Sequence, residues 1–250
     1  GNPSLAISSD RSRVAATFNN YRNLRIRLWD ASVPRLITAH DAEIEQGIGD
    51  VRARFTSDGR YLLVIAEHYQ SVPRLFLFDG ETGKLVSERN DFGSGAGDKV
   101  LIGNTARYVL LPNNGSLWDV IENRPITTIK GSATFSPNDR WISIVHEKEI
   151  EIWDTATGEL HKTLVGHTGS VESVEFSADS TELVSGSYDG TARIWRVETG
   201  EQVRTFAADE NPFAPKSDDR EIVRRVRISA DGTRVATQTT KQIALWSVAT

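Results

Sequence analysis

The sequence contains no cysteine and no methionine among its 250 residues. Without cysteine there can be no disulfide, no thiolate zinc site and no cysteine nucleophile, and the redox environment is left open. A natural chain of this length usually carries several methionines, including the initiator, yet this one begins with Gly1. We therefore expect residues 1–250 to be a piece excised from a longer, multidomain protein.

Long apolar runs, helical periodicity and an excess of positive charge are also missing. No apolar run approaches the roughly eighteen residues that a membrane span needs, so no membrane partner is expected. The net charge is −5 and the pI is about 5.6, which disfavours nucleic-acid binding because that depends on basic surface. No segment keeps a 3.6-residue apolar period, so helices should be nearly absent. No signal peptide is recognisable, and we expect a cytoplasmic location.

Six times along the chain a β-rich run ends in an aromatic residue followed by a polar one. The aromatics are Trp29, Phe78, Trp118, Trp153, Trp195 and Trp246. They are separated by 49, 40, 35, 42 and 51 residues, and self-similarity at about 40–50 residues is typical of a repeat architecture. The repeats run from end to end, so we predict a single repeat domain over residues 1–250.

Each repeat also contains a tight-turn sequence followed by further β-rich runs. The turns are Ser8–Arg11, Thr56–Gly59, Gly103–Thr105, Ser136–Asp139, Ser177–Ser180 and Ser229–Gly232. The strands predicted directly after them are Arg13–Phe18, Tyr61–Ile65, Tyr108–Leu111, Trp141–Val145, Glu182–Ser185 and Arg234–Thr237. Four short strands per repeat, joined by hairpin turns, predict an all-β fold.

Residues 160–201 carry a specific family pattern. Gly166-His167, Ser177-Ala178-Asp179, Ser185–Gly190 and Ile194-Trp195 strongly resemble the WD-repeat β-propeller family. Elsewhere the resemblance rests on the aromatic endings and the turns. It implies a β-propeller of about six four-stranded antiparallel blades around a central channel. Because no fourth strand follows Trp246, the last blade is expected to lack its own outer strand, which a partner, another copy or a missing segment would complete.

The same resemblance implies a structural hydrogen-bond tetrad of His167, Ser185, Asp189 and Trp195. In such a tetrad the aspartate accepts from the imidazole, the imidazole donates onward to the serine, and the indole N–H needs a buried acceptor. A Ser-His-Asp set could also be a catalytic triad, but a structural lock is favoured. No Gly-x-Ser-x-Gly elbow and no His-Glu-x-x-His metal motif is present. We predict no enzyme activity, no cofactor and no metal site.

The other five repeats depart from this pattern. Repeat four has Ser143 and Glu147 at the places of the tetrad serine and aspartate, but no Gly-His pair. Repeats one, three and six keep little beyond the aromatic residue. We therefore expect these repeats to be held by packing alone.

Loop lengths differ between the two ends of each repeat. The turn after the aromatic keeps one length, with its turn residue always five positions on: Pro34, Gly83, Asn123, Gly158 and Gly200. The second-to-third and fourth-to-first connections vary, and in a four-stranded meander both lie at the same end. Because loops on a rigid scaffold carry function, we expect binding at this end. The notable segments there are Asn19–Asn23, Asp41–Asp50, Glu67–Pro73, Asn90–Lys99 and Ala207–Ile222.

Arginines gather on two matching first strands. Arg224, Arg225 and Arg227 lie in repeat six, and Arg52 and Arg54 lie in repeat two. They could form an anion-attracting ring near the channel. The alternative, which we favour, is that they pair with the many carboxylates.

In proteins that this chain resembles, partners often contact residues just before the tetrad aspartate and at the start of the first strand. On that basis the candidate partner-binding residues are Tyr188, Ser170, Glu172, Arg224, Asp98, His146 and Thr239, with Phe213 added from the longest loop. An aromatic residue and arginines on an exposed rim have the composition of a binding hot spot. Ordinary surface exposure of Tyr188 is the competing interpretation.

The sequence therefore predicts a non-catalytic protein–protein interaction scaffold that presents a variable loop face to a protein or peptide partner. The alternative is an accessory, sensor or substrate-gating propeller of a multidomain enzyme, or of a signalling or defence protein, whose active site lies outside this chain.

Overall fold

The computed structural model describes residues 3–20, 23–43, 48–68, 72–90, 99–111, 114–207 and 221–248. Within these ranges the regular elements are all β-strands, arranged as six antiparallel sheets, which confirms the predicted fold class. The described part of the chain contains no helix that could cross a membrane. The chain divides into two compact units, Gly1–Thr128 and Ile129–Thr250.

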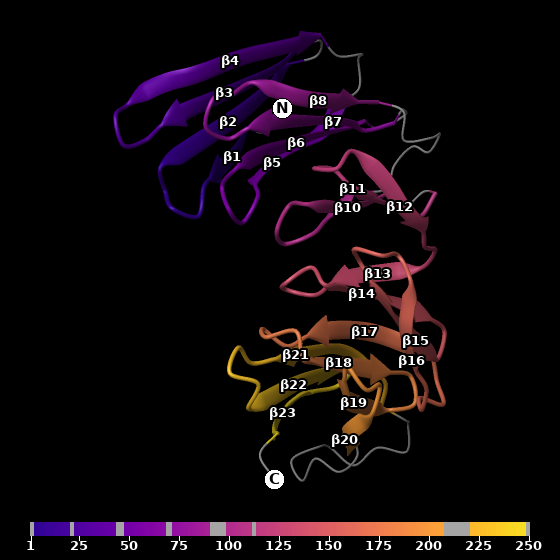
Figure 1. Ribbon diagram of the computed structural model, residues 1–250. Helices are drawn as coiled ribbons and strands as arrows, with labels where there is room; N and C mark the ends of the chain where they lie inside the picture. Colours follow the sequence, from indigo (N-terminus) through magenta and orange to yellow (C-terminus); the bar gives the residue numbers. More distant parts are fainter. Residues whose placement is uncertain are drawn as a thin grey trace. The chain divides into compact units, whose positions relative to one another are not determined.

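The first unit contains three four-stranded meanders, drawn in indigo to magenta in Figure 1. The first sheet is β1 (Ser4–Ile7), β2 (Arg13–Asn20), β3 (Asn23–Asp30) and β4 (Arg35–Glu43). The second is β5 (Ile48–Phe55), β6 (Tyr61–His68), β7 (Arg74–Asp79) and β8 (Leu85–Arg89). The third is β9 (Leu101–Ile102), β10 (Tyr108–Leu111), β11 (Ser116–Asp119) and β12 (Arg124–Thr128).

The second unit contains two more four-stranded meanders and a last sheet with three strands among the described residues. The fourth sheet is β13 (Ser132–Phe135), β14 (Trp141–His146), β15 (Glu149–Asp154) and β16 (Leu160–Leu164). The fifth is β17 (Val171–Phe176), β18 (Glu182–Ser187), β19 (Thr191–Arg196) and β20 (Gln202–Ala207). The sixth is β21 (Val223–Ile228), β22 (Arg234–Thr239) and β23 (Ile243–Ser247).

The aromatic residue lies near the end of the third strand of every sheet, and the backbone around it is uniform. In all five four-stranded sheets the pairing with the outer strand shifts register directly before this aromatic. In the turn after it, Gly83, Asn123, Gly158 and Gly200 all have φ between 53° and 74°. Glycine and asparagine tolerate this left-handed conformation best, which explains their place in the predicted turns.

The turn between the first and second strands is also repeated. In the fifth sheet Ser177 Oγ donates to Asp179 Oδ1 at 2.6 Å, and the Thr181 N–H donates to the same oxygen at 3.0 Å. The Ser177 hydroxyl is the main cause that lowers the pKa of Asp179. Four further turns repeat the pair: Ser8 with Asp10, Thr56 with Asp58, Ser136 with Asn138, and Ser229 with Asp231.

The fourth residue of this turn is left-handed in every repeat, whether or not it is glycine. Arg11 has φ 60°, close to the 71° of Gly59 and the 70° of Gly232. A non-glycine residue in this region carries a strain of roughly 1–2 kcal/mol, whereas glycine costs about 0.5–1 kcal/mol of unfolded-state entropy.

We expect Arg11→Gly to stabilise the chain by about 0.5 kcal/mol, because the strain removed exceeds the entropy added. Urea unfolding measures the change. Gly232→Arg is the matched control and should destabilise, since a Cβ at Gly232 would meet nothing within 4 Å and only the backbone term would change. If the wild type and both variants were equally stable, the left-handed conformation at Arg11 would carry no strain.

Neighbouring sheets within a unit share apolar cores. We call the face of a sheet that packs on the following sheet its front face, and the opposite face its back face. Leu28 on the front of the first sheet packs in one cluster with Phe55 and Phe76 of the second. Ile194 on the front of the fifth sheet packs with Val226 of the sixth. These cores hold neighbouring sheets of a unit together. The connections between strands lie at the two ends of each sheet.

Candidate functional site

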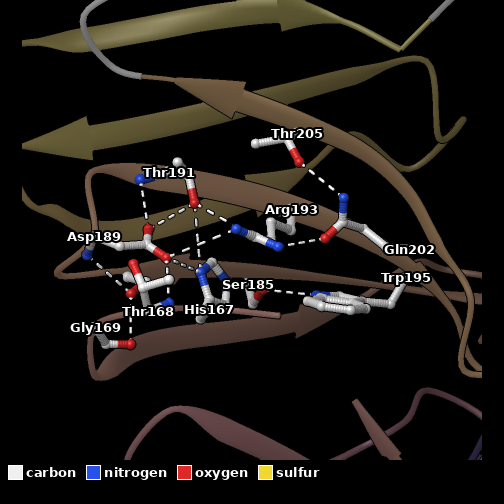
Figure 2. Close-up of polar contacts among 11 residues, drawn as sticks. His167, Thr168, Gly169, Ser185, Asp189, Thr191, Arg193, Trp195, Gln202 and Thr205 are labelled. Atoms are coloured by element: carbon white, nitrogen blue, oxygen red, sulfur yellow. Dashed lines mark hydrogen bonds and ion pairs between the residues drawn. The ribbon is translucent and has the colours of Figure 1, made fainter. Parts of the chain in front are cut away.

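Four buried side chains, from the strands of the fifth sheet and the connections beside them, are linked by hydrogen bonds (Figure 2). His167 Nδ1 lies 2.8 Å from Asp189 Oδ2, and His167 Nε2 lies 2.8 Å from Ser185 Oγ. Trp195 Nε1 donates to the same serine oxygen at 2.8 Å. The structure therefore brings together the four residues that the family resemblance singled out.

The protonation states of His167 and Asp189 determine which group donates in each of these hydrogen bonds. Burial lowers the pKa of His167 below its usual value, so the ring is neutral and has a single N–H. Burial raises the pKa of Asp189, but hydrogen bonds from Thr191, His167 and Thr168 outweigh it and hold the pKa at about 2. The ionised Asp189 takes the imidazole N–H, so Ser185 donates to Nε2. This reverses the imidazole-to-serine donation expected from the sequence.

The hydrogen bonds among Ser185, His167 and Asp189 have the pattern of a hydrolytic triad, but the serine is not accessible to a substrate. The Ser185 side chain has no solvent exposure, and its oxygen already accepts from the indole of Trp195. A serine nucleophile must be able to reach its substrate, which an enclosed Ser185 cannot do. In the described residues no three or more His, Asp or Glu side chains are grouped to hold a metal. The geometry supports a packing role for these four side chains.

We expect acidification to weaken the fold through His167. Its pKa is lowered in the folded state, so the unfolded chain takes up the proton first as the pH falls below about 6.5. The stability that neutral His167 provides is present above that pH and is lost as the pH falls through the folded pKa. Urea unfolding measures the free energy of unfolding of the wild type and of His167→Asn, and the difference between them should become smaller from about pH 7.5 to pH 5. A difference that does not change with pH would contradict the assignment of a neutral His167.

The other sheets differ from the fifth at the serine position, and the strand register shows why. Ser185 lies two residues beyond Leu183, which pairs with Trp195. In the fourth sheet Trp153 pairs with Ile142, so Ile144 takes the serine place. The expectation that Ser143 does so is therefore wrong. Ser143 faces the other side of the strand and donates to the Thr134 carbonyl at 3.3 Å.

Two of these sheets nevertheless satisfy their indole N–H, so the expectation of packing alone is also wrong. Trp153 Nε1 donates to Glu151 at 2.8 Å. Trp246 Nε1 donates to Thr237 at 2.9 Å, and Thr237 has the register of Ser185. A hydroxyl two residues past the partner of the tryptophan was the sequence signal that could have found this bond.

A second group of residues lies in the second unit, at the end of the sheets that carries the second-to-third and fourth-to-first connections. We call this end the loop end. The pairing of β17 skips Glu172, and the pairing of β21 skips Arg224, so both residues sit at matching β-bulges. A bulge re-aims a side chain away from the regular alternation. Arg224 Nη1 lies 3.9 Å from Glu172 Oε2, and the guanidinium carbon lies 5.9 Å from the ring centre of Tyr188.

Tyr188 is 40% exposed, and its backbone N–H donates to the Ser170 carbonyl at 2.8 Å. The structure thus brings Tyr188, Ser170, Glu172 and Arg224 together, across two neighbouring sheets. We call these four residues the Tyr188 patch. It lies beside the buried tetrad, because Asp189 follows Tyr188 directly.

Two other candidates, His146 and Thr239, do not join this patch. The strand register places His146 and Thr239 level with Ser187, one residue before Tyr188, because their hairpins are shorter. Thr239 is buried, and His146 Nε2 lies 3.2 Å from Glu151. Asp98 and Phe213 lie outside the described residues, as do most of Asn90–Lys99 and of Ala207–Ile222.

Most of the arginines on the two matching first strands have carboxylate partners. Arg52 bonds to Glu67 and to the carbonyl of Val100, the residue directly before β9. Arg227 lies 3.9 Å from Glu175, and Arg224 pairs with Glu172 as described. These contacts support the alternative of local charge pairing over an anion-attracting ring.

Comparison with known families identifies one repeat directly. Residues 158–196 match the family described as WD domain, G-beta repeat. The match covers strands β16 to β19 and includes all four tetrad residues. It confirms the resemblance found in residues 160–201.

Several known proteins are similar to about half of the chain or less. Eukaryotic translation initiation factor 3 subunit I of Schizosaccharomyces pombe is 33% identical over 120 residues, which is 48% of this chain and 32% of that protein. The same subunit of Emericella nidulans is 34% identical over 105 residues, 42% of this chain and 28% of that protein. Protein tipD of Dictyostelium discoideum is 34% identical over 97 residues, 36% of this chain and 16% of that protein. The chain thus spans about a third or less of these relatives.

Proposed function

We propose that this chain, which carries a WD repeat at residues 158–196 within an all-β fold of six sheets, is a non-catalytic scaffold that binds a protein or peptide partner at its loop end. The Tyr188 patch is the observation that carries the proposal. It joins an exposed aromatic ring to an arginine from the neighbouring sheet, on backbone fixed by two bulges.

The chemistry of the patch suits a protein or peptide partner. Tyrosine and arginine are enriched among the residues that dominate binding energy, since each offers a broad flat surface with a polar edge. The Glu172–Arg224 contact is long and half exposed, so the guanidinium keeps donors for a partner carbonyl or carboxylate. The fixed backbone lowers the entropy lost on binding.

Similarity to a protein named as a subunit of translation initiation factor 3 supports a place in a multi-subunit assembly. A shared role of that kind would also place this chain in the cytoplasm. We further propose that the six sheets act as one repeat domain. Within the described residues β23 has no outer strand, and we propose that a strand from another chain or copy completes that sheet.

We expect the wild-type chain, immobilised and exposed to a phage library of random peptides, to enrich a common sequence pattern. Tyr188→Ala and Arg224→Ala should each reduce capture of that peptide by about tenfold or more, the effect of a hot-spot side chain. Arg196→Ala is the matched control, because Arg196 is a half-exposed arginine in a surface ion pair with Glu201 at the opposite end of the same sheet. Unchanged capture in both patch variants would refute the proposal.

A further inference from the structure

The Tyr188 patch holds polar side chains that the described part of the protein does not use for hydrogen bonding. Within the described residues, no hydrogen bond involves the side chain of Ser170, Glu172, Tyr188 or Arg224. All four residues are exposed, while the backbone beneath them is fixed by the hydrogen bond from Tyr188 to Ser170 and by the two bulges. The patch is therefore a rigid surface whose donors and acceptors can serve a ligand.

The donor edge of Arg224 has no hydrogen-bond acceptor among the described residues. Its guanidinium carbon lies 5.9 Å from the centre of the Tyr188 ring, within the range of a cation–π contact. Its Nη1 lies 3.9 Å from Glu172 Oε2, which is longer than a hydrogen bond. Arg107 shows the alternative, because its Nε and Nη2 both donate to Asp119 Oδ2, at 2.9 and 2.7 Å. Arg224 therefore keeps the N–H groups that Arg107 directs at its own carboxylate.

Two other carboxylates near the patch in sequence are occupied. Asp189 is buried, and its two oxygens accept four hydrogen bonds from its neighbours. Glu221 Oε2 accepts from Gln242 Nε2 at 3.0 Å. In the described part of the chain, Glu172 is thus the carboxylate that faces the arginine of the patch.

The patch suits a ligand that carries negative charge and accepts hydrogen bonds. Against the single carboxylate of Glu172 stand the guanidinium of Arg224 and the hydroxyls of Ser170 and Tyr188, which can all donate. A ligand carboxylate has about four lone-pair sites and matches the fork of a guanidinium with two parallel hydrogen bonds. A cationic ligand would find one carboxylate and would have to lie beside Arg224, a charge of the same sign.

We propose that the Tyr188 patch binds the side-chain carboxylate of an aspartate or glutamate in the partner. Arg224 donates two parallel hydrogen bonds to that carboxylate, and the hydroxyls of Ser170 and Tyr188 donate to its remaining lone pairs. Glu172 faces the same guanidinium and limits the affinity by repulsion. The inference rests on the proposed function and deepens it, because it names the chemistry that the patch selects.

Pools of random peptides built from uncharged residues test the proposal. Three pools are amidated at the C-terminus and differ only in a fixed central glutamate, glutamine or lysine. The immobilised wild-type chain should capture the glutamate pool about tenfold more strongly than the glutamine pool, the value of hydrogen bonds to a charged group. The lysine pool should be captured least.

A fourth pool separates the two sources of a peptide carboxylate. It has the central glutamine and a free C-terminal carboxylate in place of the amide. Its capture should stay close to that of the amidated glutamine pool. Capture equal to or above that of the glutamate pool would overturn the assignment to a side chain.

Variants of the two charged patch residues identify the contact. With Arg224→Gln, the glutamate and glutamine pools should be captured equally, because the fork that distinguishes them is gone. With Glu172→Gln, capture of the glutamate pool should rise about threefold, the size of an exposed charge interaction. Glu147→Gln is the matched control. It removes an exposed carboxylate from the neighbouring hairpin, where the Glu147 carbonyl accepts from the Val171 N–H at 2.6 Å, and it should leave capture unchanged.

Near-ultraviolet circular dichroism verifies that each variant is folded. If Arg224→Gln is not, Arg224→Lys replaces it, and loss of the fork should then reduce the preference for glutamate. A glutamate preference that persists in full in the Arg224 variant overturns the inference, as does an equal rise of capture in Glu172→Gln and Glu147→Gln.

The outcomes for the wild type separate this inference from the proposed function. Equal capture of the glutamate and glutamine pools, or a preference for lysine, overturns the inference and leaves the proposed function intact. Capture of none of the pools refutes the proposed function itself, and the inference with it.

Discussion

Replacing Trp195 with alanine is expected to lower the free energy of unfolding by about 3–5 kcal/mol. The indole is 1% exposed and lies in the core shared by the fourth and fifth sheets. Its removal leaves a cavity beside Ile152 and takes a hydrogen bond from Ser185. The cavity contributes most of the loss, because the net value of one neutral hydrogen bond is only about 1 kcal/mol.

Urea unfolding followed by circular dichroism measures the change, and two further variants separate its causes. Trp195→Phe keeps most of the ring volume but loses the N–H, so it should cost about 1–2 kcal/mol. Trp246→Ala is the matched control in the last sheet, where the indole is half-buried and the loss should be smaller. If Trp195→Ala lost no more stability than Trp246→Ala, the core around Trp195 would not be better packed than the core around Trp246.

The repeated elements could be predicted from the sequence because each depends on local chemistry. Strand β18 was expected over Glu182–Ser185 and spans Glu182–Ser187. Turn residues such as Gly158 and Asp179 are fixed by φ or by side-chain hydrogen bonds that involve only their neighbours. The sequence also predicted a last sheet without its own outer strand, and among the described residues that sheet has three strands.

The errors arise where hairpin lengths differ. Counting back from Trp153 and Trp246 aligned His146 and Thr239 with Tyr188, but shorter hairpins place them one residue earlier in register. A shift of one residue turns a side chain to the opposite face of a sheet. The same one-residue shift misplaced Ser143, whose position belongs to the other face of β14.

The Tyr188 patch was only partly predictable. The family resemblance named its four residues, but their contact depends on the packing of β17 against β21, which no local pattern encodes. The two bulges at Glu172 and Arg224 arise from an extra residue in each first strand. An alternation count does not show such a residue, because it requires knowledge of the paired strand.

Replacing Asp189 with alanine is the change expected to affect both stability and binding. Its carboxylate accepts from His167 Nδ1 at 2.8 Å, from the Thr168 N–H at 3.0 Å, and from the N–H and hydroxyl of Thr191 at 2.9 and 2.6 Å. Asp189 is 7% exposed, so water cannot replace it at all of these donors. Stranding several buried donors should cost about 3–5 kcal/mol, as when one partner of a buried polar pair is removed.

The effect on binding results from the position of this carboxylate between two parts of the Tyr188 patch. Its hydrogen bonds connect the turn after Tyr188 to the segment before Ser170. Loss of the carboxylate should therefore reduce peptide capture about as strongly as Tyr188→Ala, even at temperatures where the variant is folded. Asp179→Ala is the control, because that carboxylate is exposed in a turn at the opposite end of the sheet. It should cost about 1 kcal/mol and leave capture unchanged. Full capture by folded Asp189→Ala would mean that the patch holds its shape without the tetrad, and that the two are independent.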